Sequence, residues 1–117
     1  MREIKFRAWD AEHKKMRGHT DPQTIQAVIF GNDYGGRIEI MQYTGLKDKN
    51  GKEIYEGDIA SCVYNGNSNI YTVVFDLSEL DYKATNGKKN YGENFQYMPC
   101  CEEIEIIGNI YENPELL

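Results

Sequence analysis

The sequence predicts a mainly β chain, built as a small SH3-like, partly open barrel with an N-terminal strand extension and short helical turns. Short runs alternate apolar and polar residues with period two, and polar or glycine-containing turns separate these runs. No long amphipathic helical pattern occurs. Because 117 residues suffice for one hydrophobic core, we expect a single domain over residues 1–117, with an extension over 1–37 and the barrel core over 38–117.

The first alternating run, Glu3–Trp9, predicts a half-buried strand. Period two places Ile4, Phe6 and Ala8 on one face of that strand. A strand near a chain terminus with an apolar face and no proline is suited to pairing with another chain. We therefore expect self-association through the terminal strands.

The next segments predict a turn, a return strand and a helix start. Asp10–Lys15 is charged and predicts the turn, and Met16 begins a short return strand. Asp21 before Pro22 is a helix-start signal, because Asp accepts hydrogen bonds from free N–H groups and proline suits the first helical position. The β-branched residues within 23–30 suit a strand equally well, so we expect a short helical turn followed by a strand.

Two further segments lead into the centre of the chain. The glycine-rich stretch Gly31–Gly36 predicts a loop. It lacks the Gly-Lys-Ser/Thr ending and the long following helix of a phosphate-binding loop, so phosphate binding is disfavoured. Arg37–Tyr43 alternates again and predicts a strand.

The central stretch, residues 41–59, combines two turns with β signals on both sides. Asn50-Gly51 predicts a two-residue hairpin turn with positive φ at both positions. Gly57-Asp58 predicts a second tight corner that feeds the next strand. The residues that we expect to shape these turns are Gly45, Asn50, Gly51, Gly57 and Asp58.

The remainder of the chain predicts further strands. Ile59–Tyr64 and Ile70–Phe75 predict a hairpin that turns over Asn65–Asn69. The later elements expected are a helical turn over Leu77–Lys83, a turn-forming segment over Ala84–Gly92, strands over Phe95–Tyr97 and Glu103–Ile107, a bulge at Gly108 and a last helical turn from Asn113-Pro114.

Three segments resemble the YopX family of small phage and prophage proteins. They are the central Gln42–Asp58, the opening Arg2–Asp10 and the closing Ile107–Leu117, which follow one another in the family's order. The resemblance implies a mostly β, oligomeric protein in the cytoplasm of a bacterial host. The family's biochemical function is not established, and the resemblance implies no catalytic residues.

The charge distribution bears on which partners the protein can bind, and the cysteine content bears on the cellular compartment in which it is expected. The net charge of -6 lies in the second half, since residues 1–60 hold ten basic and ten acidic residues while residues 61–117 hold three and nine. Acidic surface repels phosphate backbones, so nucleic acid is a disfavoured partner. Three cysteines do not form a secreted disulfide framework, and no run suits a signal peptide or a membrane span. We expect a cytoplasmic protein with no membrane partner.

Candidate ligands and catalytic groups each have a simpler interpretation. His13 and His19 lie in a charged stretch and are expected to be solvated, and Cys100-Cys101 lacks the spacer typical of zinc ligands. Cys62 alternates with Ala60 and is expected to pack in the core. We predict no metal and no cofactor.

The central stretch also contains carboxylates with two interpretations. A calcium loop aligned on Gly51 would place Leu46 and Gly57 at its end ligand positions, where carboxylates are required. Glu56 and Asp58 could suggest acid-base catalysis, but an Asp after glycine is more typical of turn capping. We predict no catalytic residue and a protein that is not an enzyme.

Aromatic residues are abundant, with nine Tyr, four Phe and one Trp. They could complete the barrel core, form a protein interface or stack nucleotide bases beside Lys83, Lys88 and Lys89. The residues predicted for an interface are Trp9, Tyr64, Tyr71, Tyr82, Tyr91, Phe95 and Tyr97.

These observations predict a non-enzymatic phage or prophage accessory protein that self-associates. It is expected to bind a host or phage protein through its aromatic, acidic second half. The alternative is a nucleic-acid-binding accessory protein that uses local basic patches. Those patches comprise Lys14, Lys15, Arg17, Lys47, Lys49 and Lys52.

Overall fold

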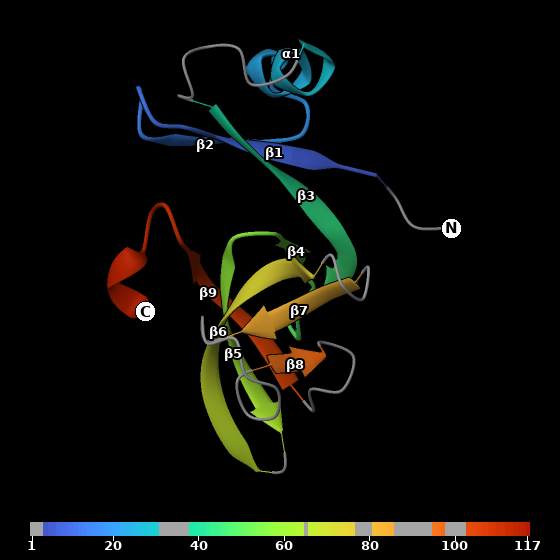
Figure 1. Cartoon of the computed structure of the whole chain (residues 1–117), viewed down its shortest axis with the longest axis vertical. Helices are drawn as coiled ribbons and strands as arrows, with labels where there is room; N and C mark the ends of the chain where they lie inside the picture. The colour runs from blue at the N-terminus through green and yellow to red at the C-terminus, as the bar shows by residue number, and fades with distance from the viewer. Residues whose placement is uncertain (1–3, 31–37, 65, 77–80, 86–94, 98–102) are drawn as a thin grey trace. The chain divides into compact units, whose positions relative to one another are not determined.

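The computed structural model describes residues 4–30, 38–64, 66–76, 81–85, 95–97 and 103–117 (Figure 1). These residues form nine strands, one α-helix and a short 3-10 turn. In chain order the elements are β1 Phe6–Asp10, β2 Lys15–Arg17, α1 Pro22–Phe30, β3 Ile38–Lys47, β4 Glu53–Tyr55, β5 Asp58–Tyr64, β6 Asn67–Asp76, β7 Asp81–Thr85, β8 Phe95–Tyr97, β9 Glu103–Asn109 and the 3-10 turn Pro114–Leu116.

The strands form two sheets, of orders β2-β1-β3-β4 and β8-β7-β6-β5-β9. The prediction of a mainly β chain with a curled, partly open barrel and short helical turns is confirmed. The chain divides into two compact units, residues 1–45 and 46–117, which we call unit 1 and unit 2. The boundary falls within β3, whereas the sequence predicts an extension that ends at residue 37.

In unit 1, β1 lies between β2 and β3. Trp9 faces Met16 of β2 and Glu39 of β3 in two antiparallel ladders. Both sides of β1 are therefore paired within the chain, so this strand does not offer the open edge that pairing with another chain requires. Its expected apolar face is correct at the buried Ala8 but wrong at Ile4, which precedes the strand and is 66% exposed.

Helix α1 covers one face of the unit 1 sheet. Ala27 packs in a core cluster with Ala8 and Ile38, and Ile40 packs against that cluster. Because two of these residues are alanines, the helix backbone can approach β1 closely. The helix begins where predicted, as Asp21 Oδ1 accepts the N–H of Gln23 at 2.9 Å.

The strand predicted to follow this helix start is wrong, because residues 22–30 are helical throughout. The β-branched residues favour a strand only weakly, and tertiary packing overrides such a preference. Here Thr24 and Ala27, one helical turn apart, are the two buried residues of α1. Helical spacing is what brings both of them to the sheet.

In unit 2, β5 pairs with β6 on one side and with β9 on the other. The predicted hairpin is confirmed, although its turn is tighter than predicted, since Tyr64 faces Asn67 across the ladder. The predicted bulge near Gly108 is also confirmed. Ile59 faces Gly108 while Ala60 faces Ile106, so β9 carries one extra residue.

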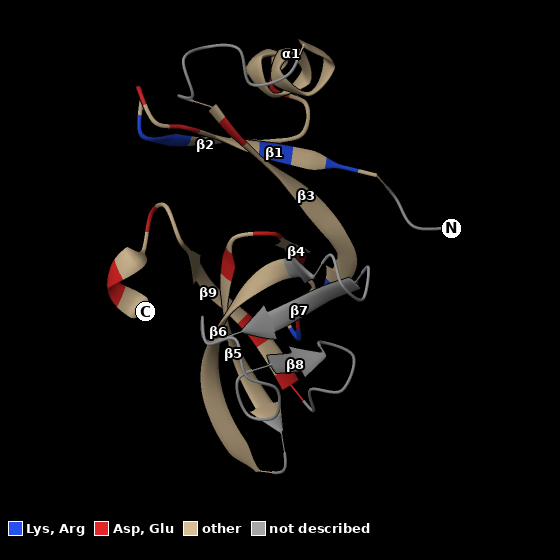
Figure 2. Ribbon diagram, viewed as in Figure 1, with Lys and Arg blue, Asp and Glu red and all other residues tan. Residues whose placement is uncertain are grey.

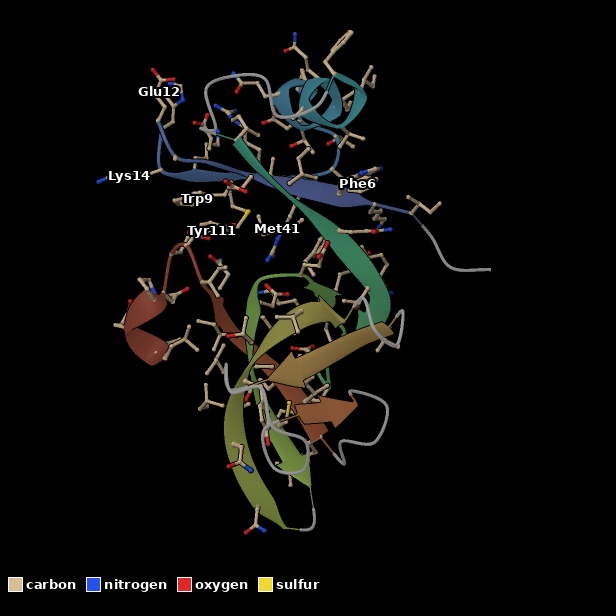
Figure 3. The ribbon with its side chains drawn as sticks, in the orientation of Figure 1. Phe6, Trp9, Glu12, Lys14, Met41 and Tyr111 are labelled. Carbon is tan, nitrogen blue, oxygen red and sulfur yellow. The ribbon has the colours of Figure 1, made fainter. Side chains whose placement is uncertain are left out.

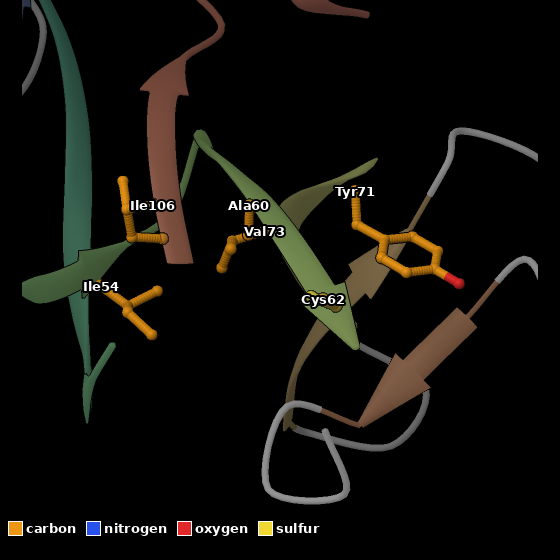
Figure 4. Packing of buried hydrophobic residues seen from close by; sticks show 6 residues of the cluster. All are labelled: Ile54, Ala60, Cys62, Tyr71, Val73 and Ile106. Carbon is orange, nitrogen blue, oxygen red and sulfur yellow. The ribbon is translucent and has the colours of Figure 1, made fainter. Parts of the chain in front are cut away.

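The core of unit 2 is formed by side chains from β4, β5, β6 and β9 (Figure 4). Cys62 is 1% exposed and packs there, as predicted. The cluster comprises Ile54, Ala60, Cys62, Tyr71, Val73 and Ile106.

Some predicted elements fall partly or wholly outside the described residues. The helical turn predicted over Leu77–Lys83 is wrong at Asp81–Lys83, which belong to β7. Residues 77–80 and 86–94 lie outside the described part, as does the loop predicted at 31–36. The predicted strand over Phe95–Tyr97 is confirmed as β8, and the last helical turn is confirmed at Pro114–Leu116.

Candidate functional site

The carboxylate of Asp48 joins the central turn to the last strand of unit 2. Asp48 is 7% exposed, and its Oδ1 atom accepts the N–H groups of Asn50 and Lys52, both at 2.9 Å. Its Oδ2 atom accepts the N–H of Ile106 in β9 at 3.0 Å. One side chain thus satisfies three backbone donors from two distant segments.

The turn around Asp48 differs from the predicted one. The N–H of Asp48 donates to the carbonyl of Lys52 at 2.8 Å, and that of Gly51 donates to the carbonyl of Asp48 at 3.0 Å. Gly51 has φ 82°, whereas Lys14 is the only described non-glycine residue with positive φ. The predicted two-residue turn with positive φ at Asn50 is wrong. The geometry is that of a three-residue hairpin loop with glycine in the left-handed position.

This turn covers the outer edge of β9. The N–H of Lys49 donates to the carbonyl of Ile104 at 2.9 Å, beside the bond from Ile106 to Asp48. The Lys49 ammonium also lies 3.6 Å from Glu103 and 3.9 Å from Glu105. Backbone groups that a neighbouring strand would otherwise engage are thereby occupied. We call this arrangement, formed by Asp48–Lys52 on β9, the Asp48 clip.

The clip depends on an ionised carboxylate. Burial alone would raise the pKa of Asp48, but the hydrogen bonds from the N–H groups of Ile106, Lys52 and Asn50 outweigh burial. The pKa of Asp48 therefore lies below its ordinary value. Charged hydrogen bonds of this kind are stronger than neutral ones, which explains how one carboxylate can hold two segments together.

The second corner is also held by a buried carboxylate. Asp58 is 1% exposed and its Oδ2 atom accepts the N–H of Tyr55 at 2.8 Å. Gly57 has φ 83° and donates its N–H to the carbonyl of Val73 at 2.9 Å. These contacts place Asp58 in a structural role at the start of β5. Gly45, with φ 90°, lies within β3.

A third buried carboxylate organises unit 1. Asp10 is 2% exposed, and its Oδ2 atom accepts the Nη2 and Nε of Arg17 at 2.8 and 2.9 Å. Arg17 Nη1 donates to Asp21 Oδ2 at 3.1 Å. Burial alone would raise the pKa of Asp10, yet the hydrogen bonds from Arg17 and His13 hold that pKa well below its usual range. The network ties both strands of the first hairpin to the start of α1.

Neither histidine belongs to a cluster of possible metal ligands among the described residues. His13 Nδ1 lies 2.8 Å from Asp10 Oδ2, and the His13 side chain is 58% exposed. His19 Nδ1 accepts the N–H of Phe6 at 3.4 Å. In the described part of the chain, no three His, Cys, Asp or Glu side chains lie close enough together to hold a metal ion. Cys100 and Cys101 lie outside the described residues.

Two of the seven aromatic residues predicted for an interface have described side chains, one in each unit. Trp9 is partly buried in β1, and Tyr71 is 5% exposed and packs in the unit 2 core. Tyr64 is the last residue of β5, and its side chain, like those of the remaining four, is outside the described part of the structure. Those four are Tyr82, Tyr91, Phe95 and Tyr97.

The predicted basic patches are partly neutralised by acidic neighbours (Figure 2). Arg17 is bound to Asp10 and Asp21, and Lys49 lies between two glutamates. Lys14 projects from the turn that joins β1 to β2, which also contains Glu12 (Figure 3). The other predicted basic residues are exposed, and they are Lys15, Lys47 and Lys52.

An apolar surface that the sequence did not predict lies on α1. Four large apolar side chains of this helix are exposed, by 47% at Ile25, 39% at Val28, 67% at Ile29 and 65% at Phe30. The helix contains no charged residue, although Asp21 directly precedes it (Figure 2). We call these four residues the α1 face. Expecting a strand over these residues concealed a surface that only helical spacing creates.

None of the helices in the described residues has both the length and the apolar character needed to cross a membrane.

The chain is similar to known proteins over essentially its whole length. A family model described as YopX protein matches residues 5–117. The solved structure of protein EF1440 from Enterococcus faecalis is similar, with 25% identity, a TM-score of 0.66, and coverage of 100% of this chain and 99% of that one. YopX from Bacillus subtilis shares the fold at 20% identity and a TM-score of 0.51, with the same coverage. No curated protein matched the chain.

Proposed function

The chain belongs to the YopX family, and on that basis we propose that it is a non-enzymatic phage or prophage accessory protein that binds proteins in the cytoplasm of a bacterial host. The observation that carries this proposal is the α1 face. Exposed apolar residues gathered on one uncharged element are typical of protein interaction sites, whereas single exposed apolar residues are not. Self-association belongs to the same proposal.

The roles of the described carboxylates support a non-enzymatic function. A catalytic acid or base must reach a substrate, either directly or through one water molecule. Asp10, Asp48 and Asp58 are instead buried, and each accepts hydrogen bonds from backbone groups or from an arginine. Their chemistry serves the fold.

The alternative function, nucleic-acid binding, is less well supported by the charge arrangement. Phosphate recognition needs cations that are available to displace counterions. Arg17 is 13% exposed and already paired with two carboxylates, and Lys49 shares its charge with Glu103 and Glu105. The net charge of -6 adds long-range repulsion.

An affinity capture from phage-infected host lysate tests the proposal, with and without nuclease. We compare the parent with Ile29→Glu on the α1 face and with Leu117→Glu, whose parent residue is 66% exposed in unit 2. The captured protein is then purified and its binding to each variant is measured over a range of salt concentrations. We expect nuclease-resistant binding that is lost in Ile29→Glu, retained in Leu117→Glu and only weakly dependent on salt.

One other outcome decides against protein binding, and another decides only against the α1 face as its site. Capture that disappears with nuclease and weakens steeply with salt would establish the nucleic-acid alternative. Nuclease-resistant binding that is unchanged in Ile29→Glu would move the interface away from α1, towards the aromatic second half of the chain.

A further inference from the structure

We propose that the α1 face is a self-pairing surface, at which α1 of one copy packs against α1 of a second copy across a two-fold axis. This inference rests on the proposed protein-binding function and names the partner of the same surface.

The spacing of the exposed residues suits helix-to-helix packing. At 3.6 residues per turn, Ile25, Val28 and Ile29 lie within an arc of about 100°. Phe30 lies outside this arc. The buried Ala27 lies about 160° from Ile25 around the helix axis, and the buried Thr24 lies between Ala27 and Val28. Residues spaced by three and four form the ridges that interlock between packed helices.

The absence of charge on the helix restricts what can cover it. A partner that placed a charged group against α1 would bury that group without a counter-charge, which is costly. The occupant must therefore be an uncharged apolar surface. The α1 face of a second copy has this character, and a two-fold axis brings the same patch of both copies together.

Charge distribution favours contact through unit 1. Residues 1–45 hold seven basic and six acidic residues, whereas residues 46–117 hold six and thirteen. Two copies that meet through unit 2 would bring strongly acidic surfaces together, and two that meet through unit 1 would not. Pairing through β1 or through the outer edge of β9 is also disfavoured, because β1 is an inner strand and the Asp48 clip covers β9.

A charge-exchange experiment on the full chain tests this inference. Light scattering measures the mass of the parent from low micromolar to about 200 micromolar, since a modest apolar interface gives micromolar affinity. We expect the parent to reach twice the chain mass of 13.5 kDa. Ile29→Glu and Ile29→Lys should each raise the dimer dissociation constant by about tenfold or more. Mixing these two variants should restore the dimer, because in the proposed contact residue 29 of each copy lies near the two-fold axis and so beside residue 29 of the other.

The controls separate this surface from other exposed apolar residues. The control variant is Ile4→Glu. Ile4 lies in the same unit as Ile29, and its exposed fraction of 66% is close to the 67% of Ile29. This variant should leave the dimer unchanged, and circular dichroism should show that all variants retain the fold. Two Ile29 variants that stay monomeric when mixed would overturn the two-fold arrangement.

The remaining outcomes distinguish this inference from the proposed function. A parent that stays monomeric throughout would overturn self-pairing, while α1-dependent binding of a captured protein would leave the protein-binding part of the proposed function intact. A dimer that forms equally well in Ile29→Glu would also overturn self-pairing at α1.

Discussion

The Asp48 carboxylate accepts the backbone N–H of Ile106 at 3.0 Å across 58 residues of sequence. This bond is the side-chain contact through which the Asp48 clip reaches β9. The N–H of Ile106 is buried, so it has no ready access to water when Asp48 is removed. Together with the bond from the N–H of Lys49 to the carbonyl of Ile104, the bond from Ile106 to Asp48 ties the central turn to the last strand.

Removing the Asp48 side chain should destabilise the protein. Asp48→Ala leaves the buried N–H of Ile106 without an acceptor, which costs about 1 to 3 kcal/mol. The melting temperature should fall by roughly 5 to 15 °C in thermal unfolding followed by circular dichroism. The melting temperature of Asp48→Asn, which keeps one acceptor oxygen, should lie between those of Asp48→Ala and the parent. A melt of Asp48→Ala that overlays the parent would show that the clip contributes nothing.

Lys49→Ala is the matched control for the clip. It removes an exposed ammonium whose carboxylate distances are 3.6 and 3.9 Å, while the backbone N–H of residue 49 still reaches Ile104. Surface ion pairs contribute less than about 1 kcal/mol, so the melting temperature should change little. If Lys49→Ala lowered the melting temperature more than Asp48→Ala does, the lysine charge and not the Asp48 carboxylate would be what stabilises the clip.

Acid should weaken the parent more than Asp48→Asn. The pKa values of Asp10 and Asp48 are lowered in the folded chain, so the unfolded chain binds more protons in acid. Their contribution to stability is complete above the unfolded pKa of about 4 and is lost as pH falls through the folded values. Urea unfolding between about pH 7 and pH 2 should therefore show the difference between parent and Asp48→Asn shrinking as pH decreases. A constant difference would mean that the ionisation of Asp48 is not coupled to folding.

Two glycines provide a test of backbone strain in the central turn. Gly51 has φ 82° and open space around it, so an added Cβ meets no atom but must adopt a left-handed backbone. Gly51→Ala should cost about 1 kcal/mol for this reason alone. Gly18 also has open space but is without positive φ, so Gly18→Ala should be neutral or slightly stabilising. Equal melting temperatures for the two variants would contradict strain at Gly51.

Arg17 should stabilise unit 1 chiefly through Asp10. Arg17→Ala removes both bonds to Asp10 Oδ2, at 2.8 and 2.9 Å, and leaves a buried carboxylate poorly paired. The variant should melt below the parent, and the loss should be smaller when Asp10→Ala is already present. A double-mutant cycle on thermal melts measures this coupling, and strictly additive losses would contradict it.

The sequence predicted features that arise from local chemistry. The period-two runs located β5, β6 and β9, and Asp21-Pro22 located the start of α1. Gly51 and Gly57 both take positive φ, which few other residues tolerate. These features depend on one residue and its close neighbours, so a single sequence contains them.

Features that depend on distant partners were missed. The local pattern at Asn50-Gly51 suits a two-residue turn, but Asp48 binds Ile106 and the loop closes with three residues. The pattern of residues 23–30 suits a strand, but packing of Ala27 near Ala8 selects a helix. The exposed α1 face follows from that packing, so a sequence pattern alone could not reveal it.

The Asp48 clip also sets an order for synthesis of the chain on the ribosome. Asp48 cannot bind Ile106, and β5 cannot pair with β9, until those later residues have been synthesised. Unit 2 can therefore close only when nearly all of the chain has emerged. The contacts of unit 1 lie within the first 45 residues and can form much earlier. A nascent chain should therefore carry a formed unit 1, including α1, while β5 still lacks its neighbour β9. A truncation before residue 106 should leave unit 2 open, however long the chain is given to fold.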